Sequence, residues 1–138
     1  MLDHFTARTR RSWIRWTGWI LTGLPCGLML LSASLKLRHE PGLVAQVTGK
    51  FGFSESALTG LAALEIACVL LYAIPRTALV GAILLTGYLG GAIATHVRVA
   101  DHGFVVPLLL GLFVWAGLYL RQGTPQALLS PSWQSATR

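Results

Sequence analysis

Charged residues are scarce in this chain. Asp, Glu, Lys and Arg make up 12% of its 138 residues, whereas a typical soluble domain carries about 25%. Apolar residues supply 54% and are gathered in long uninterrupted blocks. A chain of this kind cannot cover its apolar surface in water, so its composition excludes a soluble globular domain and a disordered protein.

The motifs of common cofactor chemistries are missing as well. The two cysteines, Cys26 and Cys68, form no CxxC pair. There is no HExxH, no nucleophile elbow, no glycine-rich nucleotide loop and no haem-attachment CxxCH. We therefore predict no metal site, no catalytic group and no resident cofactor. A bound quinone is the alternative to the absence of a cofactor. The net charge of +6 does not indicate nucleic-acid binding, because the basic residues flank the apolar blocks.

Four apolar blocks are present instead, at residues 16–35, 57–74, 77–95 and 104–120. Crossing a hydrocarbon layer about 30 Å thick takes roughly 20 helical residues. The sequence thus predicts an all-α, integral membrane four-helix bundle, formed as one domain by residues 16–121.

Basic residues predict the orientation of this bundle. Residues 1–15 contain Arg8, Arg10, Arg11 and Arg15, and positive charge near membrane helices favours the cytoplasmic side. We expect a basic cytoplasmic N-terminus, and a cytoplasmic, largely flexible tail at residues 122–138. The protein is predicted to be a multi-pass protein of the cell inner membrane.

The connection between the first two blocks has a pattern of its own. Pro41 is suited to the first turn of a helix, and Leu43, Val44, Val47 and Phe51 then fall roughly on one face. This spacing predicts a short amphipathic helix at the membrane surface, which a glycine at position 52 would end.

Small residues predict how the helices pack. Gly23-x-x-x-Gly27 and Gly87-x-x-x-Gly91 lie within spans, and such pairs let membrane helices approach closely. We expect packing within the chain, with a homodimer through these glycine-rich faces as the alternative.

Glu65 is an ionisable residue within the second block, and such a residue is a candidate functional group. Its depth from the cytoplasmic end is roughly 13–14 Å at 1.5 Å per residue, close to the depth of Thr86 and Tyr88. A hydrogen bond to either is therefore expected. Hydrocarbon surroundings favour the neutral carboxyl. Lys36 and His96 are expected to lie at the outer rim, too far away to contact it.

Three segments together resemble the DoxX-like family of small bacterial four-helix membrane proteins. They are Ser32-Ala-Ser-Leu-Lys36-Leu37, Leu58-Thr-Gly-Leu-Ala-Ala-Leu-Glu65 and Gly90-Gly-Ala-Ile-Ala-Thr-His96-Val-Arg98. The resemblance implies four membrane helices and a polar signature at Lys36, Glu65, His96 and Arg98, without assigning them roles. It also implies association with membrane redox systems.

The functional expectation combines these observations. We predict an accessory or ligand-binding membrane subunit that binds a quinone or lipid-like molecule, with the lipid bilayer and a redox protein as partners. The alternative is a small carrier or channel that uses Glu65 for protons or solute. An enzyme with Glu65 and His96 as acid and base is disfavoured, because they are expected roughly 12–15 Å apart in depth. The candidate site residues are Glu65, Tyr88, Thr86, Lys36, His96 and Arg98.

Overall fold

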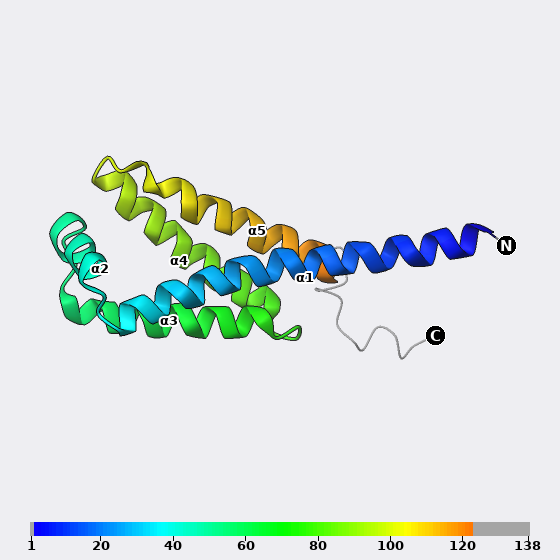
Figure 1. Ribbon diagram of the computed structural model, residues 1–138, viewed down its shortest axis with the longest axis horizontal. Helices are drawn as coiled ribbons and strands as arrows, with labels where there is room; N and C mark the ends of the chain where they lie inside the picture. Colours follow the sequence, from blue (N-terminus) through cyan, green and yellow to red (C-terminus); the bar gives the residue numbers. More distant parts are fainter. Residues whose placement is uncertain (1, 123–138) are drawn as a thin grey trace, which may run out of the picture.

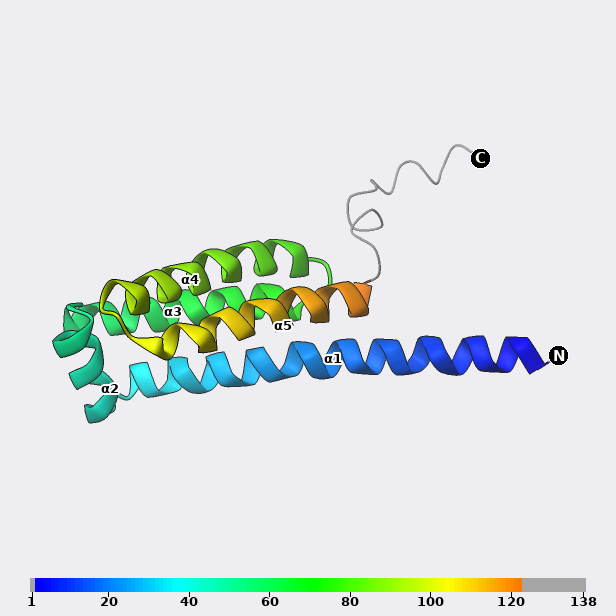
Figure 2. The ribbon, with the colours of Figure 1, turned by 90° about the horizontal axis from the view of Figure 1, so that it is seen from above.

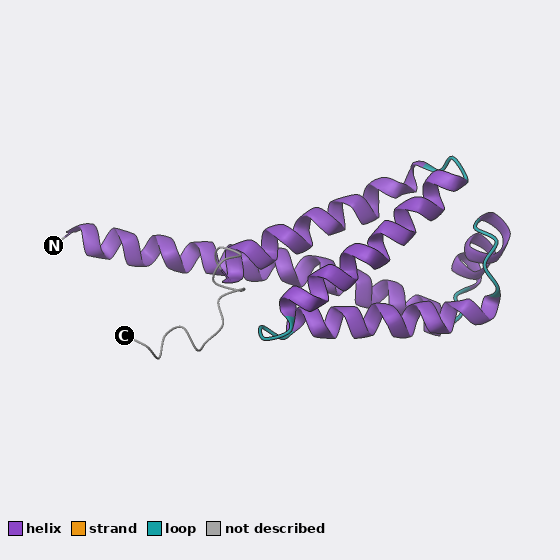
Figure 3. Cartoon of the chain, turned by 180° about the vertical axis from the view of Figure 1, so that it is seen from behind, coloured by secondary structure: helices purple, strands orange, loops and turns teal. Residues whose placement is uncertain are grey.

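The computed structural model describes residues 2–122, and within that range the chain is helical apart from short turns (Figure 3). Its long helices are α1 (Leu2–Leu37), α3 (Glu55–Ala73), α4 (Ala78–Arg98) and α5 (Val105–Gln122). Its short ones are α2 (Pro41–Ala45), the π-helix η1 (Gln46–Lys50) and the 3-10 turn η2 (His102–Phe104).

Four segments are long and apolar enough to cross a membrane. They are Trp16–Leu37, Glu55–Ala73, Ala78–Arg98 and His102–Arg121. The predicted all-α membrane four-helix bundle is therefore confirmed. Their bounds agree with the four apolar blocks of the sequence to within a few residues.

The four long helices form a closed ring. Each packs against two others, in the order α1, α3, α4, α5 and back to α1. The start of the α1 span and the end of α5 lie at one end of the bundle, opposite α2 (Figures 1 and 2). Both ends of the bundle domain thus lie on one side of the membrane; that this side is cytoplasmic stays a prediction.

Helix α1 is longer than its membrane span. It begins at Leu2 and projects well beyond the end of α5 (Figure 2). The basic segment at residues 1–15 is thus continuous with the first span as helix from residue 2. The flexible tail predicted for residues 122–138 lies, except for residue 122, outside the described residues.

The predicted amphipathic segment lies across one end of the bundle (Figure 1). The Glu40 carboxylate accepts a hydrogen bond of 2.8 Å from the Leu43 amide and caps α2, with Pro41 in the first turn. A capping oxygen of this kind satisfies an amide that has no partner within the helix. We call residues 41–51 the cap.

The apolar face of the cap packs onto the bundle. Val47 and Phe51 form a buried cluster with Leu58 of α3. Gly52 follows with φ +73°, a conformation that a residue with a Cβ rarely adopts. The prediction of an amphipathic segment ended by this glycine is confirmed.

The half of the bundle away from the cap is tightly filled. Tyr72 is fully buried and donates a hydrogen bond of 2.8 Å to the Val114 carbonyl. Its oxygen lies 3.3 Å from the Thr22 hydroxyl. A Cβ at Gly81 would overlap the Tyr72 backbone, and one at Gly117 would lie 2.9 Å from the Thr22 oxygen. These two glycines let α4 and α5 approach their neighbours.

The glycine pairs singled out in the sequence do not serve this purpose. A Cβ added at Gly23, Gly27, Gly87 or Gly91 would meet nothing within 4 Å. The expectation that these pairs mediate packing within the chain is therefore wrong. A GxxxG spacing indicates only that a helix face is flat, and other helices need not cover that face.

Gly81→Ala should destabilise the bundle by about 1–3 kcal/mol, because overpacking forces the α3 and α4 backbones apart. Thermal unfolding in detergent micelles measures the effect. Gly60→Ala is the matched control, since a Cβ there meets nothing within 4 Å and alanine favours the helix. Equal melting temperatures for the two variants would contradict the close α3–α4 contact.

Candidate functional site

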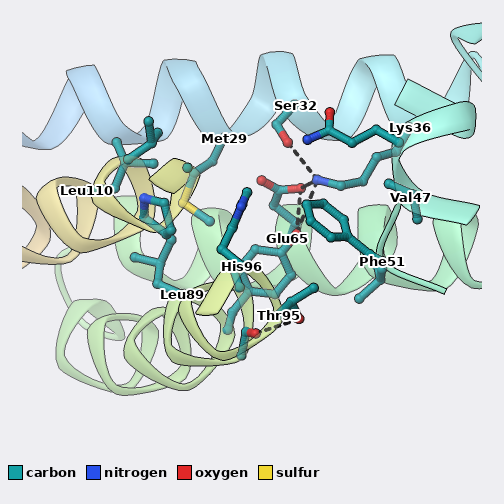
Figure 4. Close-up of a pocket in the computed structure, with 18 of the residues that line it drawn as sticks. Met29, Ser32, Lys36, Val47, Phe51, Glu65, Leu89, Thr95, His96 and Leu110 are labelled. Carbon is teal, nitrogen blue, oxygen red and sulfur yellow. Dashed lines mark hydrogen bonds and ion pairs between the residues drawn. The ribbon is translucent and has the colours of Figure 1, made fainter. Parts of the chain in front are cut away.

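A polar cluster connects three helices in the half of the bundle next to the cap (Figure 4). Lys36 Nζ of α1 lies 2.5 Å from Glu65 Oε2 of α3 and 2.6 Å from the Ser32 hydroxyl. Tyr88 of α4 donates a hydrogen bond of 3.0 Å to the same Glu65 oxygen. The Glu65 side chain is 3% exposed and that of Lys36 11%. The predicted Glu65–Tyr88 hydrogen bond is confirmed.

The expectation that Lys36 lies too far from Glu65 is wrong. Helical side chains lean toward the N-terminus of their own helix. Because α1 and α3 run in opposite directions, Lys36 leans into the bundle while Glu65 leans toward the cap. In addition, α1 ends short of the level at which α3 begins (Figure 1). A depth estimated from the rise of 1.5 Å per residue takes neither effect into account.

The ammonium group changes the surroundings of the acid. The expectation of a neutral Glu65 rested on a carboxyl surrounded by hydrocarbon alone, whereas Lys36 and Tyr88 both contact its Oε2. The cluster is a hydrogen-bonded ion pair.

Beside this cluster lies a cavity of about 1000 Å³. Its wall is mainly apolar and includes Met29, Leu64, Leu89 and Leu110, while the cap covers one end. Binding sites for small molecules are typically cavities of roughly 300–1,000 Å³ with apolar walls and few polar groups. The arrangement thus has the dimensions and lining of a ligand site.

Gly87 and Gly91 also line this cavity. Because neither has a Cβ, the wall that α4 contributes recedes at these two positions. The glycine pair that the sequence assigned to helix packing therefore widens the cavity instead.

His96 faces the same cavity from the outer end of α4 (Figure 4). Its Nδ1 lies 2.6 Å from Asp101 Oδ2, and Lys50 of the cap lies 3.1 Å from the other Asp101 oxygen. The hydrogen bond from His96, and then that from Lys50, lowers the pKa of Asp101 to about 2. His96 and Glu65 thus line one cavity, although their positions along the helices predicted that they would lie at different depths.

Two candidate residues lie outside the cavity lining. Thr86 is exposed, donates to the Ala82 carbonyl and accepts from the Trp115 indole at 3.0 Å. Its expected bond to Glu65 is wrong, because it faces α5 instead. Arg98 donates to the Phe51 carbonyl and so holds the cap to α4. It therefore contacts the cap rather than the cavity.

Sequence reasoning missed the functional position of Asp101. The residue follows α4 in a tight turn, where Ala100 has φ +52°, and this turn brings it back toward His96. Gly103 completes the turn, because a Cβ there would lie 2.6 Å from the His96 ring. The only signal in the sequence was the polar run around the short connection between the last two spans.

Comparison with known proteins identifies the family. The sequence profile of the DoxX-like family matches residues 20–117, which contain the ion pair, the cavity and the cap. The chain belongs to the DoxX-like family. Searches of curated proteins and of solved structures found no match. Membership confirms the resemblance to this family, and it supplies no reaction. Among residues 2–122 of this DoxX-like protein, no group of three His, Cys, Asp or Glu residues could hold a metal ion.

Lys36→Met should destabilise this DoxX-like protein by about 3 kcal/mol, because it leaves Glu65 buried without its cation. The double variant Lys36→Met, Glu65→Leu should recover most of the loss, since no buried charge remains. Thermal unfolding of both in micelles checks this. A double variant less stable than Lys36→Met would contradict the ion pair.

Asp101 should make stability depend on pH in the acid range. Its pKa is about 2 when folded and 3.8 ordinarily, so its contribution is fully present above about pH 5 and is lost as pH falls through 2. The melting-temperature difference between the wild type and Asp101→Asn should therefore shrink between pH 5 and pH 2. A difference that stays constant over this range would contradict the shift.

Proposed function

We propose that this DoxX-like protein binds a small amphipathic molecule of quinone or lipid type inside the membrane, as an accessory subunit of a membrane redox system. The observation that carries the binding role is the cavity of about 1000 Å³ with the Lys36–Glu65–Tyr88 cluster on its wall. The redox association rests on the family resemblance alone.

The cost of the ion pair supports a ligand role. Two charges removed from water cost several kcal/mol each, and their attraction offsets this cost only with good geometry and further hydrogen bonds. Close packing of small residues could join α1 to α3 without that cost. The pair adjoins a cavity rather than a filled core, so its polar groups lie where a molecule in the cavity could contact them.

The position of the cavity supports an apolar ligand. Leu64, which lines it, is 50% exposed, so the cavity borders the outer surface of α3. That surface contacts hydrocarbon in a bilayer. A molecule dissolved in the membrane can therefore approach the cavity without crossing an aqueous phase.

The alternative of a carrier or channel has less support. It needs a path from Glu65 to the opposite end of the bundle. Val69 and Tyr72 of α3, with Leu118 of α5, lie along that direction, and each is at most 2% exposed. Binding without passage through the bundle is the function that the geometry favours.

The test is binding of decylubiquinone, decylubiquinol and dioctanoylglycerol to purified protein in nanodiscs, measured by calorimetry. We expect at least one of them to bind, and Lys36→Met to weaken that binding about tenfold or more. Lys36→Met removes the ammonium that holds the Glu65 carboxylate in place at the cavity wall. Loss of one positioned charged hydrogen-bonding partner typically costs about 1.5–3 kcal/mol, and 1.4 kcal/mol is a factor of ten.

Arg38→Met is the matched control for charge, because Arg38 is exposed, directly follows α1 and lies outside the cavity lining. It should bind the probes as the wild type does. The binding proposal fails if none of the three probes binds, or if both variants bind equally well.

A further inference from the structure

The N–H donors of the inner cluster are already engaged. An ammonium group has three N–H donors, and Lys36 directs them to Ser32, Glu65 and Tyr88 at 2.6, 2.5 and 3.2 Å. The Tyr88 hydroxyl in turn donates to Glu65. At this inner end of the cavity a ligand that only accepts hydrogen bonds finds no N–H donor of this cluster that is free.

One acceptor of the cluster remains available. Both hydrogen bonds of the Glu65 carboxylate within residues 2–122, from Lys36 and from Tyr88, go to Oε2. Within residues 2–122, Oε1 has no hydrogen-bond partner. It is also not fully buried. Since Glu65 lines the cavity, Oε1 is open to an occupant.

His96 supplies a second acceptor. A carboxylate can only accept, so the short contact with Asp101 places the hydrogen on His96 Nδ1. In the neutral ring, Nε2 then carries a lone pair. In the described part of the chain Nε2 has no partner, and it too is not fully buried.

The imidazole of His96 is held in place on three sides. Phe51 contacts it edge-on with ring centroids 4.9 Å apart, Asp101 fixes Nδ1, and the Gly103 backbone lies against the ring. The ring extends from α4 into the cavity (Figure 4). A group fixed in this way loses little conformational entropy when it binds a ligand.

The spacing along α4 sets the scale of the occupant. Tyr88, Ala92 and His96 follow one another at four-residue steps and line the cavity, so they share one helix face. Tyr88 and His96 are two turns apart, about 12 Å along the axis. Ala92 between them leaves room for an apolar body.

We infer that the cavity selects an apolar molecule that carries hydroxyl groups, with Glu65 Oε1 as the inner acceptor and His96 Nε2, oriented by Asp101, as the outer one. This inference rests on the proposed binding function and narrows it. A hydroquinone or a hydroxylated lipid fits this description, whereas the oxidised quinone, which only accepts hydrogen bonds, would leave both acceptors unpaired.

The test compares 5-heptylresorcinol with its dimethyl ether, which has the same apolar body but no O–H donor. Calorimetry on the full-length protein in nanodiscs should show the diol binding at least tenfold more tightly than the ether. Dioctanoylglycerol and decylubiquinol, run in parallel, tell a lipid from an aromatic occupant. Equal binding of diol and ether to the wild type overturns the inference.

His96→Phe tests the outer acceptor. It keeps a ring beside Phe51 but removes both nitrogens, so the preference for the diol should fall about tenfold while binding of the ether is retained. His96→Gln, whose amide oxygen still accepts, should keep part of the preference. An undiminished preference in a folded His96→Phe protein excludes the role of His96.

The outcomes separate the two proposals. Binding of diol and ether with equal affinity leaves the ligand-binding function standing and removes only the selectivity for hydroxyl groups. If none of the probes binds, decylubiquinone included, the function itself fails. The Arg38→Met protein, whose substitution lies outside the cavity lining, should show the wild-type preference.

Discussion

The ion pair between Lys36 and Glu65 is the interaction on which the functional half of this bundle depends. It joins α1 to α3 at 2.5 Å, and Tyr88 extends it to α4. In hydrocarbon, apolar contact gives helices no reason to associate, so polar contacts and close packing must supply it. The pair connects polar groups of three helices at once. It thereby allows the bundle to keep a cavity where a soluble protein would place a filled core.

The two halves of the bundle are held together by different means. Away from the cap, Gly81 and Gly117 let backbones meet around the buried Tyr72. Next to the cap, α4 presents Gly87 and Gly91 to open space, and hydrogen bonds replace direct contact. Dense packing at one end fixes the helix positions. The other end can then remain hollow without the helices collapsing into it.

The residues next to His96 also hold the cap. Asp101 accepts from both His96 and Lys50, and Arg98 donates to the Phe51 carbonyl. The segment that covers the cavity is therefore connected to the histidine that faces it. Rearranging the cap would therefore disturb the orientation of that ring.

The sequence by itself determined the class and the layout of this protein. Long apolar blocks predict helices that lie in lipid rather than in water. Pro41 and Gly52 indicated where the cap begins and ends. The sequence also indicated that Glu65 would be unusual and that Tyr88 or Thr86 would be its neighbour, because adjacent spans at equal depth must meet. Only the tertiary structure decided the partners of Lys36, Thr86 and His96. Those depend on the direction in which each side chain leans, on where α1 ends and on the turn at Asp101, none of which is encoded in residue spacing along a single helix.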